Sequence, residues 1–206
     1  MLLISAPALA AEPLRVLAFG DSLTAGLQLP ADAAFPAQIE RRLRADGFSV
    51  EVVNAGVSGD TTAGGLARLD FSLDEKFDLV VLELGANDML RGVQPRQTRE
   101  NLEKILDAIA AKQIPVVLAG MIASGNFGPE HKAGFDAIYP DLAKKRGLPL
   151  YPFFLAGVAG DAALAQKDGL HPTAEGVARI VAGIAPLVED ALRGILTKRA
   201  QETTAK

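Results

Sequence analysis

The sequence predicts an α/β fold, a flavodoxin-like three-layer sandwich in which helices cover both faces of a five-stranded parallel sheet. Apolar runs alternate along the chain with segments of helical spacing, a pattern that is typical of parallel sheets. The runs are almost continuous in Val and Leu, as expected of strands that are buried on both faces. Because there are five such runs, we expect the strand order 2-1-3-4-5.

The first half of the chain supplies three of these strands. Residues 14–19 (LRVLAF) form an apolar run that leads into a glycine, so we expect the first strand there. Residues 35–46 have helical spacing and are followed by Gly47, a common helix stop. Residues 50–54 (VEVVN) and 78–84 (DLVVLEL) are rich in Val and Leu and predict the second and third strands.

The second half of the chain continues the alternation. Residues 98–112 carry apolar side chains at a spacing of three and four, which predicts an amphipathic helix. Residues 115–120 (PVVLAG) predict the fourth strand, and residues 135–146 predict a helix that stops at a glycine. Residues 148–153 predict a fifth strand that two prolines interrupt.

The chain closes with a long predicted helix over residues 173–196. Thr173 is a suitable N-cap, and we expect Glu175 and Glu189 on the exposed side of this helix. The polar residues 197–206 are expected to form a frayed tail. A length of 206 residues is in the usual range for one domain, which we place at residues 12–196.

The N-terminal residues 1–11 have the features of a signal-peptide remnant. Residues 2–11 are apolar and small but too few to span a bilayer, which takes about 20 apolar residues. Ala8, Leu9 and Ala10, followed by Ala11, are typical of a signal-peptide cleavage site. The usual basic segment is missing, so an ordinary apolar arm is the alternative. We therefore expect a periplasmic or secreted protein, with a cytoplasmic location as the alternative.

The composition narrows the classes of function. The formal net charge of −4 implies no broad basic face, so we expect no nucleic-acid partner. The chain has no cysteine, which excludes disulfides, thiolate metal sites and cysteine nucleophiles. There is no P-loop motif, no dinucleotide-binding glycine motif after the first strand and no G-x-S-x-G elbow. No later apolar stretch is long enough to cross a membrane.

Short blocks of polar residues and glycine follow four of the five predicted strands. The blocks are Gly-Asp-Ser-Leu at 20–23, Ser-Gly-Asp at 58–60, Gly-Ala-Asn-Asp at 85–88 and Asp-Gly-Leu-His-Pro at 168–172. Ligands bind at the carboxyl edge of such sheets, so we expect these blocks to meet on one rim. Together they contain a hydroxyl nucleophile, a base with an orienting carboxylate, and donors for an oxyanion. This set is sufficient for acyl transfer.

The same four blocks, in this order, resemble those of the SGNH (GDSL) hydrolase family. The sequence is most similar to the small bacterial branch of lysophospholipase/acyl-CoA thioesterase I and related arylesterases, over residues 16 to about 192. A single four-residue block occurs often by chance, but all four in order are a specific signal. The resemblance implies the SGNH hydrolase fold and a serine hydrolase that uses an acyl-enzyme.

Each candidate catalytic residue has a purely structural alternative. Ser22 is the expected nucleophile, although a serine after a strand is also a common helix N-cap. His171 is the expected base, since the other histidine, His131, lies in a polar run that suggests a solvated surface. Asp168 is expected to orient the imidazole, or else to serve as an ordinary turn carboxylate.

Three donors are expected to surround the developing oxyanion. The backbone N–H of Gly59 and the side-chain amide of Asn87 are two of them, with turn geometry and a loop cap as the structural alternatives. The family resemblance adds the backbone N–H of Ser22 as the third. Asp21 and Asp88 flank these residues. We expect them to accept structural hydrogen bonds, with no metal site and no cofactor.

An acyl pocket must be apolar, and several apolar residues lie on the same rim. The candidates for the pocket are Leu27, Leu29, Met89, Leu90, Met121, Ile122 and Phe127. Taken alone, each of these residues is equally consistent with a loop residue that packs into the core. The glycine-containing segment 123–128 is a candidate for movement when substrate binds.

The leading hypothesis is a serine hydrolase that cleaves carboxylic esters. Aryl esters, short to medium acyl esters, thioesters and lysophospholipids are the candidate substrates, so the expected partner is a small ester or lipid. A carbohydrate O-deacetylase of the same family is the nearest alternative. A non-catalytic ligand-binding module is the alternative from another class. The sequence leaves the acyl-chain length and the oligomeric state open.

Overall fold

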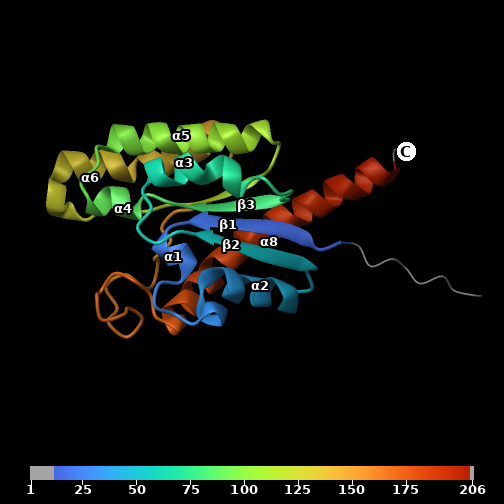
Figure 1. Cartoon of the computed structure of the whole chain (residues 1–206), viewed down its shortest axis with the longest axis horizontal. Coiled ribbons are helices and arrows are strands. Elements are labelled where there is room, and N and C mark those ends of the chain that lie inside the picture. The colour runs from blue at the N-terminus through green and yellow to red at the C-terminus, as the bar shows by residue number, and fades with distance from the viewer. Residues whose placement is uncertain (1–11, 205–206) are drawn as a thin grey trace, which may run out of the picture.

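The computed structural model describes residues 12–204, and these form a three-layer α/β sandwich (Figure 1). The expected signal-peptide remnant at residues 1–11 lies outside the described residues. The five-stranded sheet has the order β2-β1-β3-β4-β5, and every neighbouring pair is parallel. The strands are β1 (Leu14–Gly20), β2 (Val50–Gly56), β3 (Leu79–Glu83), β4 (Val116–Ala119) and β5 (Leu150–Tyr151). The predicted fold class and strand order are therefore confirmed.

Helices cover both faces of the sheet, with α2 and α8 on one side and α3 and α5 on the other (Figure 1). The helices are α1 (Ser22–Ala25), α2 (Phe35–Ala45), α3 (Thr62–Ser72), α4 (Ala86–Leu90), α5 (Pro95–Ala111), α6 (Pro129–Asp136), α7 (Ile138–Arg146) and α8 (Ala174–Thr204). Short 3-10 turns occur at Ala31–Ala33 and Gly125–Phe127. No helix in the described part of the chain is long and apolar enough to span a membrane.

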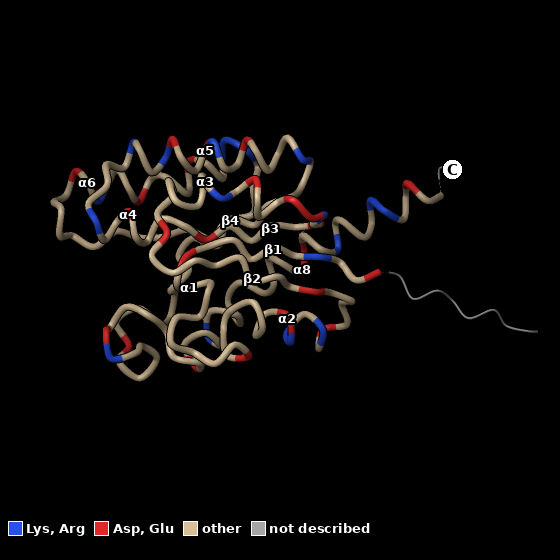
Figure 2. The backbone as a smooth tube through the Cα atoms, viewed as in Figure 1, with Lys and Arg blue, Asp and Glu red and all other residues tan. Residues whose placement is uncertain are grey.

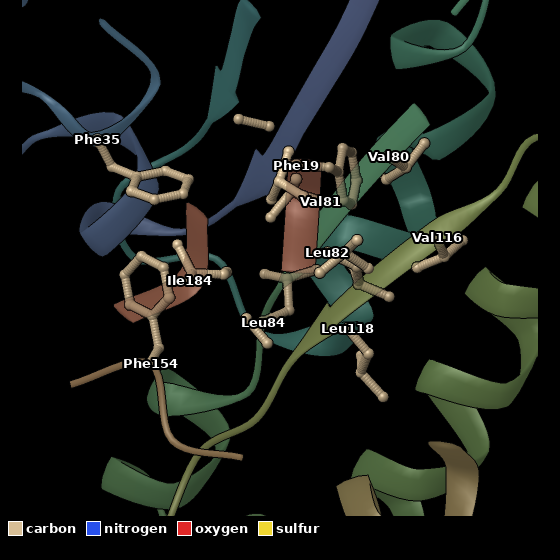
Figure 3. Close-up of a cluster of buried hydrophobic side chains, with 14 of the residues drawn as sticks. Phe19, Phe35, Val80, Val81, Leu82, Leu84, Val116, Leu118, Phe154 and Ile184 are labelled. Carbon is tan, nitrogen blue, oxygen red and sulfur yellow. The ribbon is translucent and has the colours of Figure 1, made fainter. Parts of the chain in front are cut away.

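The core lies between the sheet and its covering helices. All five residues of β3 are buried, which explains the continuous apolar run in the sequence. Phe35 of α2 and Phe154 after β5 pack edge to face, with 5.1 Å between the ring centroids, and Ile184 of α8 lies beside them (Figure 3). Full burial of each such side chain stabilises the fold by about 1.5–3 kcal/mol.

The register of the sheet brings the functional segments to one edge. Gly20, the last residue of β1, pairs with Gly56 of β2 on one side and with Glu83 of β3 on the other. Glu83 in turn pairs with Ala119, the last residue of β4. Because the four strands end level, α1, α4 and the loop between β5 and α8 meet at the same end of the molecule (Figure 1).

Two helix predictions need correction. The single helix expected over residues 135–146 is two helices, α6 and α7, which meet at Ala137. Pro140 has no N–H to donate to the carbonyl of Asp136, and its ring clashes with that carbonyl, so the helix breaks just before it. Helix α3 was not predicted, because Gly64 and Gly65 near its start weaken the helical signal.

The last helix also differs from its prediction. Helix α8 continues through Thr204, where a frayed tail was expected from residue 197. Arg199 in this extension forms an ion pair with Asp78 at the start of β3. Thr173 caps the helix as predicted, since its hydroxyl accepts a hydrogen bond from Gly176 N. Glu189, expected on the exposed side, is 9% exposed and pairs with Arg193 at 2.8 Å.

Charged residues of both signs are interspersed over the surface. Figure 2 shows basic and acidic positions following one another along α5 and α8, and no side of this view is uniformly basic. Several i, i+4 pairs join them, such as Arg96 with Glu100 at 2.8 Å.

Candidate active site

Ser22 is the first residue of α1, directly after the turn that ends β1. Its hydroxyl Oγ lies 2.8 Å from Nε2 of His171, which comes from the distant loop before α8. Asp21 rather than Ser22 is the N-cap of α1, because its carboxylate accepts the N–H of Leu23 at 3.0 Å. The structural alternative for Ser22 as a helix cap is thus taken by its neighbour, and the serine side chain faces the histidine instead.

Asp168 holds the opposite side of the His171 ring. Its Oδ2 lies 2.6 Å from His171 Nδ1, and its Oδ1 accepts the backbone N–H groups of Leu170 and His171 at 2.9 and 3.0 Å. These two N–H groups, assisted by the imidazole, lower the pKa of Asp168 to about 2. The carboxylate is therefore ionised at neutral pH, and one short loop supplies both the imidazole and the group that orients it.

Gln166 fastens this loop to the segment that follows Ser22. Its side-chain amide donates to the carbonyl of Leu27 and to that of Pro172, each at 2.9 Å. Sequence reasoning did not single out Gln166, because its partner Leu27 lies 139 residues away along the chain. Gln166 therefore links the segment that follows Ser22 to the loop that carries His171.

Gly59 and Asn87 lie close to Ser22 and line the same cavity. Gly59 has a φ of +87°, a conformation that favours glycine, and no hydrogen bond among the described residues uses its N–H as donor. The Asn87 amide donates to the carbonyl of Asp60 at 2.9 Å and to Asp21 Oδ2 at 3.2 Å. As the first residue of α1, Ser22 has an N–H without an intrahelical acceptor. The three predicted oxyanion donors are thus brought together.

Arg68 of α3 joins the two turns that carry these donors. Its Nε contacts Asp60 Oδ2 at 2.6 Å, and its Nη2 donates to the carbonyl of Gly20 at 2.8 Å. The guanidinium carbon also lies 4.1 Å from the centre of the Phe19 ring. Arg68 was not predicted as a site residue because it belongs to the helix that the sequence pattern missed.

Asp21 and Asp88 accept hydrogen bonds, as expected from the sequence. Asp88 accepts the N–H and the hydroxyl of Thr62 at 2.7 and 2.5 Å, and the hydroxyl of Thr98 at 3.2 Å. Asp21 is fully buried, and burial raises its pKa to about 6. Among residues 12–204, no group of three or more acidic or histidine side chains is arranged to hold a metal ion.

An apolar cavity of about 240 Å³ opens beside Ser22 and His171. Four of the predicted pocket residues line it: Leu27, Met89, Leu90 and Met121. Four more apolar residues were missed, namely Leu23, Ala86, Leu155 and Leu170. Leu23 and Leu170 lie inside the Gly-Asp-Ser-Leu and Asp-x-x-His blocks, so their adjacency to Ser22 and His171 was an available signal.

The other three predicted pocket residues lie outside this cavity. Leu29 packs against the core. Ile122 is 43% exposed, although its neighbour Met121 is buried. Phe127 is 48% exposed and packs on His131, with 5.2 Å between the ring centroids. His131 itself is half-buried and contacts the carbonyl of Val93 at 3.0 Å, so the prediction of a solvated histidine was wrong.

The comparisons with known proteins agree with this geometry. The model of the GDSL-like lipase/acylhydrolase family matches residues 18–179. Esterase TesA of Pseudomonas aeruginosa is 39% identical over 86% of this chain and 89% of its own length. The arylesterase of Vibrio mimicus is 42% identical, with 84% of this chain and 86% of the relative covered. The thioesterase 1/protease 1/lysophospholipase L1 of Escherichia coli K12 is 40% identical, covering 84% and 81%.

Solved structures give the same result. AlinE4, an SGNH-hydrolase family esterase, is 46% identical and superposes with a TM-score of 0.75 over 89% of this chain and 98% of that one. The crystal structure of TesA superposes with a TM-score of 0.81 at 38% identity, covering 86% and 99%. The family resemblance of the four sequence blocks is confirmed: the chain belongs to the GDSL-like lipase/acylhydrolase family of ester hydrolases.

Proposed function

We propose that Ser22, His171 and Asp168 form the catalytic triad of this ester hydrolase, which acts through an acyl-enzyme. The observation that carries the proposal is the 2.8 Å contact between Ser22 Oγ and His171 Nε2 at the wall of an apolar cavity. A base within hydrogen-bond reach of a hydroxyl can accept its proton during attack. Asp168 then stabilises the imidazolium. Because Asp168 accepts the N–H at Nδ1, it keeps Nε2 of His171 directed toward Ser22.

The reaction proceeds in two halves. His171 accepts the hydroxyl proton of Ser22 while Oγ attacks the ester carbonyl carbon, and the tetrahedral intermediate collapses when His171 returns that proton to the leaving alcohol or thiol. A water molecule then transfers a proton to His171 and attacks the acyl-enzyme. The acid is released, and the proton returns to Ser22.

The oxyanion that forms in each half needs fixed donors. We assign this role to the backbone N–H groups of Ser22 and Gly59 and to the side-chain amide of Asn87. Support comes from the cavity, which all three residues line beside the serine hydroxyl. The amide of Asn87 also has partners at Asp60 and Asp21, which hold it at the cavity wall.

The apolar lining favours substrates with a hydrocarbon acyl or aryl group. Aryl esters, short to medium acyl esters, thioesters and lysophospholipids fit this chemistry, and the names of the relatives include esterase, arylesterase and thioesterase/lysophospholipase. A carbohydrate O-deacetylase is less well supported, since seven of the residues lining the cavity are Leu or Met and offer few hydrogen-bond partners to a sugar.

Rates on p-nitrophenyl esters of increasing acyl length test the proposal, beside a lysophospholipid, an acyl-CoA and an acetylated sugar. We expect turnover of the apolar esters and none in the Ser22→Ala variant. Preference for the acetylated sugar would favour the deacetylase instead. Failure of an organophosphonate probe to label the wild-type chain would favour a binding module without catalysis.

The proposed site of action is the periplasm or the exterior of the cell, with residues 1–11 as the remnant of a signal peptide. The support is the cleavage-like sequence at Ala8–Ala11 alone. N-terminal sequencing of the exported protein tests it. A mature chain that begins near Glu12 is the expected result, and a cell-associated protein with intact Met1 would contradict it.

A further inference from the structure

We propose that Glu83 is held as a neutral carboxylic acid whose proton is donated to the Asp21 carboxylate, and that this bond positions Ser22 and Asn87 for catalysis. Glu83 is a positioning residue in this proposal, which rests on the proposed function of Ser22. Nothing in the sequence pattern distinguished Glu83, because it lies inside the apolar run of the third strand.

Glu83 lies directly beneath the turn that carries Ser22. It is the last residue of β3, pairs with Gly20 of β1 and is 1% exposed. A Cβ atom at position 20 would lie 2.6 Å from Glu83 Oε2 and 2.0 Å from Thr24 Oγ1. Only glycine at position 20 therefore leaves room for the Glu83 carboxyl group against the backbone of the turn.

The hydrogen bonds of Glu83 involve only one of its two oxygens. Oε2 accepts the hydroxyl of Thr24 at 2.8 Å and the N–H of Asp21 at 3.3 Å. Oε1 is buried and has no hydrogen-bond partner among the described residues. A buried ionised carboxylate with a bare oxygen is costly, whereas a protonated oxygen needs an acceptor rather than a donor.

Asp21 provides that acceptor. The N–H of Asp21 donates to Glu83 Oε2 at 3.3 Å, and hydrogen bonding between the two carboxyl groups affects the pKa of both. The Asp21 oxygens already accept the N–H of Leu23 at 3.0 Å and the amide of Asn87 at 3.2 Å, as expected of the ionised member of a carboxyl pair. One proton on Glu83 therefore satisfies both groups, while two carboxylates in contact would repel each other.

The charges around the pair favour the proton on Glu83. Burial and the neighbouring Asp21 raise the pKa of Glu83 well above its usual range. The pKa of Asp21 is raised less, because Leu23 N–H, Asn87 and the nearby His171 favour its ionised form. Two further groups bond to the backbone next to the pair: Arg68 on α3 donates to the carbonyl of Gly20, and Tyr139 on α7 donates to the carbonyl of Leu84. The pKa of Tyr139 is raised by its burial and by the charges of Asp88, Glu83 and Asp21.

The position of Asp21 determines two parts of the active site. Its carboxylate caps α1, which begins with Ser22, and it also holds the amide of Asn87. A change at Glu83 that removes the proton donor frees Asp21 to rotate or to draw in water. Since Glu83 does not line the cavity, such a change acts on kcat more than on KM.

Two variants of similar volume separate a hydrogen-bond role from simple packing. Glu83→Gln keeps an oxygen for Thr24 and the Asp21 N–H and supplies an amide N–H to the Asp21 carboxylate. Glu83→Leu fills the space but can neither donate nor accept. We expect Glu83→Gln to retain kcat within about 10-fold of wild type, and Glu83→Leu to lose about 10²-fold or more, a loss comparable to that of an oxyanion donor.

Glu189→Leu is the matched control. Glu189 is also a buried acid with an unpartnered oxygen, but its partner Arg193 lies on α8 and away from the cavity. This variant is expected to lower stability and leave kcat as in wild type. Equal losses in Glu83→Gln and Glu83→Leu, at normal stability, would overturn the proposal.

Infrared spectroscopy tests the proton directly and needs no activity. We expect the carbonyl stretch of a protonated carboxylic acid in the wild-type protein at neutral pH, and its absence in Glu83→Gln. Its absence from the wild type would overturn the proposal even if the variants misfold. If the band is present but neither wild type nor Ser22→Ala turns over esters, the proposed function fails while the protonated Glu83 stands.

Discussion

Asp168 Oδ2 lies 2.6 Å from His171 Nδ1, and only two residues separate Asp168 from His171 in the chain. In many triads the two groups come from distant segments, so their alignment depends on the packing of the whole fold. Here the alignment depends on one turn, which the N–H groups of Leu170 and His171 close onto the Asp168 carboxylate. Orientation of the imidazole is thus a local property of the loop, and Gln166 provides its tie to the rest of the site.

Asp168→Asn is expected to lower kcat by about 10²–10⁴-fold without abolishing turnover. The asparagine oxygen can still accept the two backbone N–H groups, so the loop keeps its shape. The amide group, however, does not stabilise an imidazolium and permits the wrong tautomer. Steady-state rates on a p-nitrophenyl ester measure the effect, with Ser22→Ala as the variant that nearly abolishes turnover. Wild-type rates in both variants would contradict the triad.

Gln166→Ala is expected to reduce kcat less than Asp168→Asn does. The substitution removes the two hydrogen bonds to Leu27 and Pro172 but leaves the Asp168–His171 contact in place. A loosened loop places His171 correctly for a smaller fraction of the time, at a cost of about 10-fold in rate. Labelling by an organophosphonate should slow in parallel. A rate equal to wild type would show that the loop needs no such tie.

Asn87→Ala is expected to lower kcat by about 10²–10³-fold with little change in KM, because an oxyanion donor acts on the transition state. Asn101→Ala is the matched control: it also removes a side-chain amide, one that is buried and donates to Thr62 outside the cavity. The control is expected to affect stability alone. An unchanged kcat in Asn87→Ala would remove this residue from the oxyanion site.

The sequence predicted the parts of the fold that have a local cause. Apolar runs placed the five strands within a few residues, and their alternation with helices indicated the parallel order. Residues just after the strands then had to share one edge, which brought Ser22, Gly59 and Asn87 together. Both inferences use only the neighbours of each residue along the chain.

The residues that the sequence did not reveal act through partners that are remote in the chain. Glu83 is a single acidic residue inside an apolar run, and its contact with the turn before Ser22 depends on the pairing of β1 with β3. Arg68 belongs to helix α3, which was not predicted because its two glycines weaken the helical pattern. The pocket prediction failed for Ile122 because composition alone cannot tell which of two adjacent loop residues points inward.

Met121 and Ile122 therefore form a matched pair for the acyl pocket. Met121 is 3% exposed and lines the cavity, while its neighbour is outside it. Met121→Phe is expected to lower kcat/KM for medium-chain p-nitrophenyl esters by about 10-fold or more relative to the acetate, since a misfit of a few methylenes has effects of this size. Ile122→Phe is expected to leave the chain-length preference unchanged. Equal effects would mean that the acyl group binds elsewhere.

The Glu83–Asp21 pair has a consequence for stability that is separate from its effect on rate. In the unfolded chain Glu83 ionises with a pKa of about 4.3. In the folded protein its pKa is raised well above that range, because it is buried beside Asp21. Above the unfolded pKa the folded state holds one proton more than the unfolded state. The stabilisation that comes from the protonated group is thus complete at low pH and declines as the pH rises.

Wild type should therefore lose stability relative to Glu83→Gln by roughly 1 kcal/mol for each pH unit as the pH rises from about 5, because glutamine binds no proton in either state. Urea unfolding of both proteins over a series of pH values measures the difference. Glu189→Gln serves as the control, because Glu189 is also a buried acid but lies against the guanidinium groups of Arg193 at 2.8 Å and Arg42 at 3.9 Å. A difference that stays constant with pH would mean that Glu83 ionises alike in both states, which is incompatible with a proton shared with Asp21.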